Sequence, residues 1–185
     1  MGPSTVPPSR RRADAERNHD RILAAARDVL ADRTTEMSMA EVSRRAGVGM
    51  ATLYRNFPGR RELLEALYGE EVDELCRAAG SATGPPGPAL TAWLRRFTVF
   101  HASKHPIAAE LLQHTDATDP VFGGSRDRVL AAGAPLLEAA QRTGEVRPEL
   151  TLDQVLDLVL AVTTIPGDRA YVDPLVQAAL HGLRP

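Results

Sequence analysis

The densest group of side chains that could bind another molecule lies in residues 49–60, "GMATLYRNFPGR". Thr52 and Tyr54 carry hydroxyl groups, and Arg55 and Arg60 carry guanidinium groups. Such groups donate hydrogen bonds to phosphate oxygens and to the edges of bases. The chemistry that this segment predicts is therefore recognition of a nucleic acid.

Helical periodicity orients these side chains. Leu53 and Phe57 lie four residues apart, so both point to the inner side of a helix over 50–56. Small and polar side chains take the opposite side and its flank: Ala51, Thr52, Tyr54 and Arg55. A helix with a small, polar and basic outer face can enter the major groove of DNA.

The preceding residues predict a second helix, over 38–46, joined to the first by a tight corner. Ser38 and Glu41 have the spacing of a capping box, which starts a helix whatever its function. Gly47 can adopt the left-handed conformation that ends this helix, and Gly49 can cap the next one. Two short helices with this corner predict a helix-turn-helix.

Residues 17–68 resemble the DNA-binding domain of the TetR family of transcriptional regulators, most clearly in "AGVGMATLY", Phe57 and "PGRRELL". The resemblance implies phosphate contacts from Ser38, Tyr54 and Arg60. It also implies that the recognition helix starts with Gly49, Met50, Ala51 and Thr52. Arg55 and Asn56 fall at positions that vary in the family, and we expect them to read bases. Gly49 stands where Ser is common, so the side-chain cap is lost.

The remaining segments are also helical in pattern. We predict an all-α fold of about nine helices, with a disordered arm at 1–13, a DNA-binding domain at 14–68 and a helical effector-binding and dimerisation domain at 69–185. The helices are expected at 14–32, 38–46, 50–56, 60–79, 89–104, 106–113, 119–143, 152–164 and 172–183. The breaker "GSATGPPGP" at 80–88 is a candidate boundary.

Charge and composition narrow the class of protein. Residues 1–68 hold twelve Arg against nine acidic residues, a net +3, and residues 69–185 hold ten basic against fifteen acidic residues, a net −5. One cysteine excludes an internal disulfide, and no apolar run is long enough to span a membrane. No secretory signal is visible. We therefore expect a cytoplasmic protein with a DNA-binding front half.

The rear half is expected to dimerise, because one short recognition helix buries too little surface for tight binding. Two copies would read two half-sites across a two-fold axis. We predict that the last two helices supply the dimer interface through Leu156, Val159, Leu160, Leu175, Val176, Ala179 and Leu183. The same residues could instead fill the core of one protomer, and for the first of the two helices both roles can hold.

The resemblance also implies a small hydrophobic effector bound in the rear half. Candidates for the pocket lining are Trp93, Phe97, Phe100, His101, Leu111, His114, Phe122, Leu130 and Leu137, although aromatic stripes of this kind more often form a core. His101 and His105 could share a metal ion, but no Cys or carboxylate cluster supports them. We predict no metal and no cofactor.

The function expected is a homodimeric, ligand-responsive repressor that binds double-stranded operator DNA. An activator or a ligand-independent regulator of the same fold, and a helical adaptor without DNA binding, remain alternatives. An enzyme is not expected, because the sequence lacks a nucleophile elbow, a phosphate-binding glycine loop, HExxH and paired cysteines.

Overall fold

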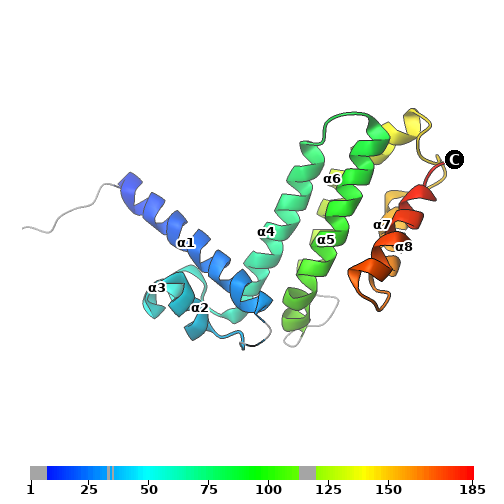
Figure 1. Cartoon of the computed structure of the whole chain (residues 1–185). Coiled ribbons are helices and arrows are strands. Elements are labelled where there is room, and N and C mark those ends of the chain that lie inside the picture. Colours follow the sequence, from blue (N-terminus) through cyan, green and yellow to red (C-terminus); the bar gives the residue numbers. More distant parts are fainter. Residues whose placement is uncertain (1–7, 33, 35, 113–119) are drawn as a thin grey trace, which may run out of the picture. The chain divides into compact units, whose positions relative to one another are not determined.

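The computed structural model describes residues 8–32, 34, 36–112 and 120–185, and it places the side chains of 12–32, 34, 36–101, 107, 111 and 124–185. The described residues contain no strand, which confirms the all-α prediction. They form α1 (Pro8–Ala31), α2 (Met39–Ala46), α3 (Met50–Asn56), α4 (Arg60–Gly80), α5 (Pro86–Leu112), α6 (Pro120–Arg142), α7 (Leu152–Thr163) and α8 (Arg169–His181) (Figure 1). None of the described helices has the length and hydropathy that a bilayer span requires.

Two of the predicted helices, 89–104 and 106–113, are one continuous helix, α5. The break was expected because proline lacks an amide hydrogen and its ring crowds the preceding turn. The helix continues past Pro106 because Ile107 and Leu111, four residues apart, are both buried and extend its apolar face. The described residues therefore contain eight helices, close to the nine expected.

Helix α1 begins at Pro8, inside the segment that the sequence predicts to be a disordered arm. Proline favours the first helical position, where its missing amide hydrogen costs nothing. The next turns hold a pair of oppositely charged residues on one face, with Arg12 donating to Glu16 at 3.2 Å. Residues 1–7 of the predicted arm lie outside the described residues.

The helices pack as two units. The N-terminal unit comprises 1–68 together with 106–114, and the C-terminal unit comprises 69–105 together with 115–185. The proline- and glycine-rich segment at 80–88 joins α4 to α5 inside the C-terminal unit, so it does not separate the units.

The N-terminal unit has a core built from one stripe of α1. Ile22, Leu23 and Ala26 are fully buried. They share the interior with Val42 of α2 and Leu53 of α3, which are also fully buried. Each of these short helices therefore has one side fixed by apolar packing and another side that faces solvent.

The C-terminal unit is organised around Trp93 of α5, which is 2% exposed and donates from its indole nitrogen to the Leu75 carbonyl of α4 at 3.1 Å. Gly133 of α6 makes room for this ring, because a Cβ there would lie 2.3 Å from the indole. Within this unit α4 and α5 run antiparallel, and α7 pairs with α8 (Figure 1).

Candidate nucleic-acid interface

The corner between α2 and α3 is a Schellman turn. Gly47 adopts the left-handed conformation, with φ +62°. Its amide donates to the Arg44 carbonyl at 3.2 Å, and the Val48 amide donates to the Ser43 carbonyl at 3.2 Å. The buried hydroxyl of Ser43 donates to the Val48 carbonyl at 2.6 Å. The direction in which the chain enters α3 is thus held by three hydrogen bonds.

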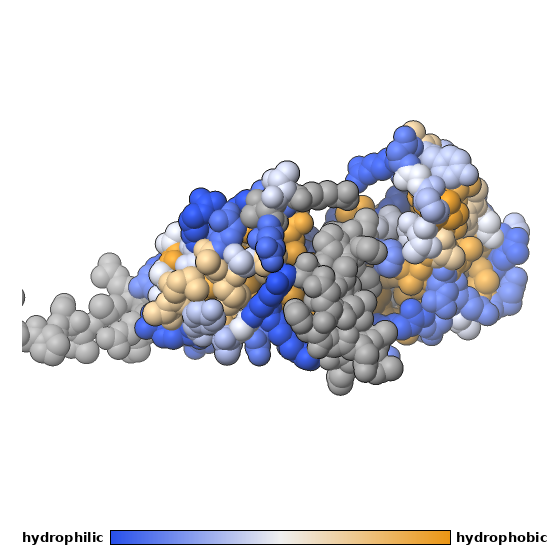
Figure 2. Space-filling model, turned by 90° about the horizontal axis from the view of Figure 1, so that it is seen from below, coloured by the Kyte–Doolittle hydropathy of each residue, from blue (hydrophilic) through white to orange (hydrophobic). Residues whose placement is uncertain are grey.

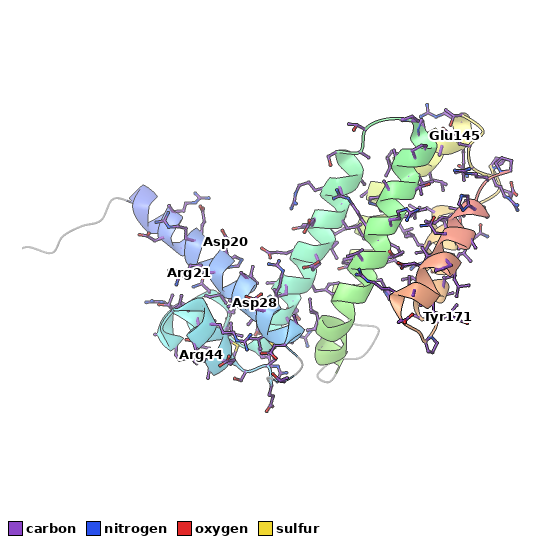
Figure 3. All side chains as sticks on the ribbon, in the orientation of Figure 1. Asp20, Arg21, Asp28, Arg44, Glu145 and Tyr171 are labelled. Atoms are coloured by element: carbon purple, nitrogen blue, oxygen red, sulfur yellow. The ribbon has the colours of Figure 1, made fainter. Side chains whose placement is uncertain are left out.

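A guanidinium group from α1 completes this corner. Arg21 donates to the Ala46 carbonyl at 2.6 Å and to the Gly47 carbonyl at 3.2 Å, so it satisfies the C-terminus of α2 (Figure 3). A hydrogen bond from a charged donor contributes roughly 1.5–3 kcal/mol. A Cβ at Gly47 would lie 2.9 Å from this guanidinium, so a larger residue there would have to displace the Arg21 side chain. Sequence analysis missed Arg21, whose two partners lie 25 and 26 residues away.

The inner side of α3 is anchored to α1. Leu53 is fully buried and Phe57, the residue that ends α3, is 3% exposed. The Phe57 ring stacks on His19 of α1 with ring centroids 4.8 Å apart. Gly49 caps α3 through its backbone alone, without a side-chain cap. The helix is therefore held by its inner side and by the turn before it.

The outer side of α3 is bare. Met50 is 39% exposed and Tyr54 is 47% exposed, and Ala51 and Arg55 are exposed with them. On the face that Figure 2 shows, moderately hydrophobic residues of the N-terminal unit lie beside hydrophilic ones. This is the orientation that helical periodicity predicts.

The polar groups of α3 are arranged around Thr52, which is half-buried. Arg55 donates to its hydroxyl at 2.9 Å, and the Asn56 amide donates to its carbonyl at 2.8 Å. Of the other predicted contacts, Gly49 is exposed, Ser38 is exposed at the start of α2, and Arg60 is half-buried as the first residue of α4.

Only half of the predicted capping box forms. The Ser38 hydroxyl accepts from the Glu41 amide at 3.2 Å. The Glu41 carboxylate does not return to Ser38 but accepts from Arg44 and Arg45, each within 2.8 Å. Hydrogen bonds from Arg44, and then from Arg45, lower the pKa of Glu41 from 4.5 to about 2. Arg45 also donates to Asp32 at 2.7 Å, which ties α2 to the end of α1.

Four of the predicted pocket residues lie in the core of the C-terminal unit. Trp93, Phe97 and Phe100 follow one another with ring centroids 6.3 and 6.1 Å apart, and none is more than 6% exposed. Leu137 is buried, and Leu130 and His101 are half-buried. Leu111 is buried in the N-terminal unit, so it does not join the others. His114 and the side chains of His105 and Phe122 lie outside the described residues.

An open hollow of ≈ 330 Å³ lies on the C-terminal unit between α4 and α5, and Phe100 is the predicted pocket residue that lines it. Its floor is apolar, formed by Leu75, Ala78, Val99 and Phe100. Charged residues of both signs also line it: Glu71, Glu74, Arg95 and Arg96.

The predicted dimer residues also face inward for the most part. Leu156, Val159, Val176 and Leu183 are buried within the protomer, and Leu160, Leu175 and Ala179 are half-buried. The exposed large apolar side chains of α7, α8 and their connection are different ones: Leu158 at 42%, Ile165 at 36% and Tyr171 at 60% (Figure 3). Helix α7 is apolar on almost every side, so periodicity alone could not separate its inner from its outer face.

A helix-turn-helix followed by an all-helical second unit defines a class, the DNA-binding transcriptional regulators. Residues 22–67 match the family model for "Bacterial regulatory proteins, tetR family", and residues 85–185 match that for "Transcriptional regulator SbtR-like, C-terminal domain". The chain belongs to the TetR family of transcriptional regulators.

Individual relatives support the same family assignment. The HTH-type transcriptional repressor LfrR of Mycolicibacterium smegmatis is 31% identical over 135 residues, which cover 72% of this chain and 69% of that protein. The crystal structure of a TetR regulator from Streptomyces coelicolor has a TM-score of 0.75 at 35% identity and covers 90% of this chain and 98% of its own. The crystal structure of a TetR regulator from Mycobacterium vanbaalenii has a TM-score of 0.76 at 30% identity, and the match covers 94% of this chain and 99% of that one.

The Glu41 cluster makes stability depend on pH. Because the folded chain lowers the pKa of Glu41 from 4.5 to about 2, this carboxylate stabilises the fold fully above pH 4.5. The contribution is lost as the pH falls from 4.5 towards 2. We expect Glu41→Gln to melt at a lower temperature than the natural chain at pH 7, and the difference to shrink between pH 5 and pH 3. Thermal unfolding followed by circular dichroism at each pH measures this difference in melting temperature.

The matched control is Glu62→Gln, which removes one exposed carboxylate from the first turn of α4. A difference between Glu41→Gln and the natural chain that stays constant or grows on acidification would contradict the role given to Glu41.

Proposed function

We propose that the chain is a homodimeric repressor that binds operator DNA with α3 in the major groove. The observation that carries the proposal is the two-sided character of α3. Its inner side is locked by Leu53, Phe57 and the Gly47 turn, and its outer side presents a hydroxyl and guanidinium set to solvent. Repression is taken from the relative LfrR, whose name describes a transcriptional repressor. Such a protein acts in the cytoplasm and needs no catalytic group.

The proposed contact residues fall into two groups, those that can reach base edges and those that can reach phosphates. Gly49 and Ala51 have almost no side chain, so the start of α3 can approach the base edges closely, with Met50 beside them. Thr52, Arg55 and Asn56 form a linked polar set that faces the bases. Ser38 at the N-cap of α2, Tyr54 on α3 and Arg60 at the start of α4 contact backbone phosphates and set the register of α3 on the duplex.

Substitutions on α3 test this division. Arg55→Ala should weaken binding to the preferred duplex by about 1–3 kcal/mol and reduce discrimination between sequences, because it removes a base contact. Tyr54→Phe should weaken binding to all duplexes about equally, because it removes one phosphate contact. Fluorescence anisotropy measures the affinity for the DNA upstream of the chain's own coding region and for a scrambled duplex. The ratio of the two affinities gives the discrimination between sequences.

The control is Arg142→Ala, which removes an exposed charge from the end of α6 and should leave affinity unchanged. Full affinity and full discrimination in both α3 variants would place the DNA contact elsewhere.

The dimer surface that we propose is the outer face of α7 and the start of α8. Leu158 lies on α7, and Ile165 lies in the bend that follows the end of that helix. The Tyr171 ring packs close to Gly167 in the connection, where a Cβ would lie 2.7 Å from it. A second copy related by a two-fold axis would cover these side chains with the same face of its own helices. The buried residues named from sequence then support this surface from inside.

A charge on this surface should separate the subunits. We expect Leu158→Glu to be monomeric in light scattering at micromolar concentration, and to lose DNA affinity because one α3 reads only one half-site. Thr83→Glu is the control, since it adds the same charge at an exposed position between α4 and α5, and it should remain dimeric. A dimeric Leu158→Glu, or a monomeric natural chain that binds DNA tightly, would contradict the assignment.

The effector site that we propose is the hollow between α4 and α5. Its apolar floor suits a small hydrophobic molecule, and its charged residues can orient a polar end. Helix α4 forms one wall and begins at Arg60, a proposed phosphate contact. A ligand that prefers one position of α4 would shift the population of DNA-binding conformations by its difference in affinity.

Filling the hollow tests the site. The apolar dye 8-anilinonaphthalene-1-sulfonate should bind the natural chain and fluoresce, and Val99→Trp should weaken its binding at least tenfold because the indole occupies the floor. Ile165→Trp, which adds the same ring at an exposed position outside the hollow, should bind the dye normally. Equal dye affinity in all three proteins would remove the hollow as the effector site.

A further inference from the structure

Arg55 lies at the centre of the outer side of α3. Successive residues of an α-helix are rotated by about 100°, so Ala51 and Arg55 both lie within about 20° of the direction opposite to Leu53. Leu53 is fully buried, and Ala51 and Arg55 are exposed. Thr52 and Tyr54 lie about 100° to either side of Leu53 and form the two flanks. A duplex that meets this outer side therefore presents base edges to Arg55 and its backbone to the flanks.

The guanidinium of Arg55 is held from one flank by a neutral group. It donates from Nη2 to the Thr52 hydroxyl at 2.9 Å. Thr52 is half-buried, and its β-branched side chain is restricted in χ1. An exposed arginine loses much conformational freedom when it binds a partner. The hydrogen bond to Thr52 removes part of that freedom before a partner arrives, which is preorganisation.

This contact does not neutralise the charge of Arg55. Residues 42–61 contain no Asp or Glu, so neither α3 nor the corner before it supplies a carboxylate. Arg44 and Arg61, on the helices before and after α3, donate instead to the carboxylates of Glu41 and Glu65. A hydroxyl partner orients a guanidinium and leaves its positive charge for a further acceptor.

The hydrogen bond to Thr52 also leaves one pair of donors on Arg55 complete. A guanidinium carries its N–H groups in one plane, and two of its edges present parallel donors, Nε with Nη2 and Nη1 with Nη2. The contact to Thr52 uses one hydrogen of Nη2, so one of these edges remains intact. In the major groove guanine offers two adjacent acceptors, O6 and N7, whereas adenine offers an acceptor beside a donor. The intact edge therefore matches guanine.

We propose that the Thr52 hydroxyl is a positioning group that holds Arg55 in the orientation that reads one guanine in each half-site. The inference rests on the proposed function, which places the outer side of α3 in the major groove. It adds the base that is read and the residue that prepares the reading. Thr52 acts through Arg55, so its hydroxyl affects discrimination only while Arg55 is present.

The test removes the hydroxyl and keeps the shape of the side chain. Thr52→Val deletes the acceptor of the hydrogen bond and retains a β-branched side chain. Because Arg55 is exposed, water solvates its guanidinium in this variant and no buried donor loses its partner. Thr52→Ser keeps the hydroxyl and should behave as the natural chain. The matched control is Thr91→Val, which removes the hydroxyl of a half-buried threonine on α5 in the C-terminal unit.

Affinity is measured by fluorescence anisotropy with the upstream duplex and with copies in which each guanine in turn is replaced by 7-deazaguanine. This base pairs normally and keeps O6 but lacks the N7 acceptor. For the natural chain, replacement of one guanine in each half-site should weaken binding about fivefold, the lower end of the range for a bidentate base contact. We call this loss of affinity the guanine penalty.

The variants should change the guanine penalty in a set order. Arg55→Ala should abolish it. Thr52→Val should reduce it to about twofold, because the contact must then offset the ordering of a free guanidinium. Thr52→Ser and Thr91→Val should keep the full penalty. In the double variant, Thr52→Val should cause no further change beyond that of Arg55→Ala.

Several outcomes would overturn this inference and leave α3 in its proposed role. They are a natural chain that binds the upstream duplex without a guanine penalty, a full penalty in Thr52→Val, and a full penalty in Arg55→Ala. Another is a loss of affinity in Thr52→Val that is equal for all duplexes and persists in the double variant, because Thr52 would then contact DNA itself.

The proposed function fails by a different result. Natural affinity of both Tyr54→Phe and Arg55→Ala for every duplex would remove α3 from the interface. Absence of binding by the natural chain to any of the duplexes would overturn the proposed function and the role of Thr52 together.

Discussion

The corner at Gly47 is the constraint on which the DNA-binding side of the protein depends. A seven-residue helix is too short to hold its own direction, so its orientation comes from what precedes and supports it. Gly47 provides the left-handed step, which costs roughly 1–2 kcal/mol for a residue with a Cβ. Arg21 then binds the two carbonyls on either side of that step. Helix α3 is thus positioned by α1, a helix that presents none of the proposed base contacts.

Much of this unit could be predicted because its signals are local. Ser38, Gly47 and the Leu53–Phe57 pair act over one or two helical turns, and helical turns are readable from spacing. Arg21 and His19 act over 25 and 38 residues, and no local pattern marks them. The half-formed capping box shows the same limit, since Glu41 is drawn from Ser38 by two arginines in the following turn.

The helices of the C-terminal unit could be predicted from the sequence, but which of their faces are buried could not. Trp93, Phe97 and Phe100 recur at helical spacing, and such a stripe fits a core and a pocket equally well. In the structure the stripe packs into the core of this unit, where the indole donates to the Leu75 carbonyl and lies against Gly133. In α7 eight of the twelve residues are apolar and lie on several sides of the helix, so the choice between Leu156 inside and Leu158 outside depends on where α8 packs. That information is not local.

The exposed large apolar residues connect the three proposed contacts. In the described part of the chain they are Met50, Tyr54, Val99, Leu158, Ile165 and Tyr171. Two of them lie on α3, one lines the hollow beside α4, and three lie on the outer side of α7, α8 and their connection. Elsewhere apolar side chains of this size are covered, so exposure is confined to places where a duplex, an effector or a second copy would supply the missing cover. In each case a feature that is unfavourable in the isolated chain becomes favourable in a complex, and this joins the stability of the protein to its function.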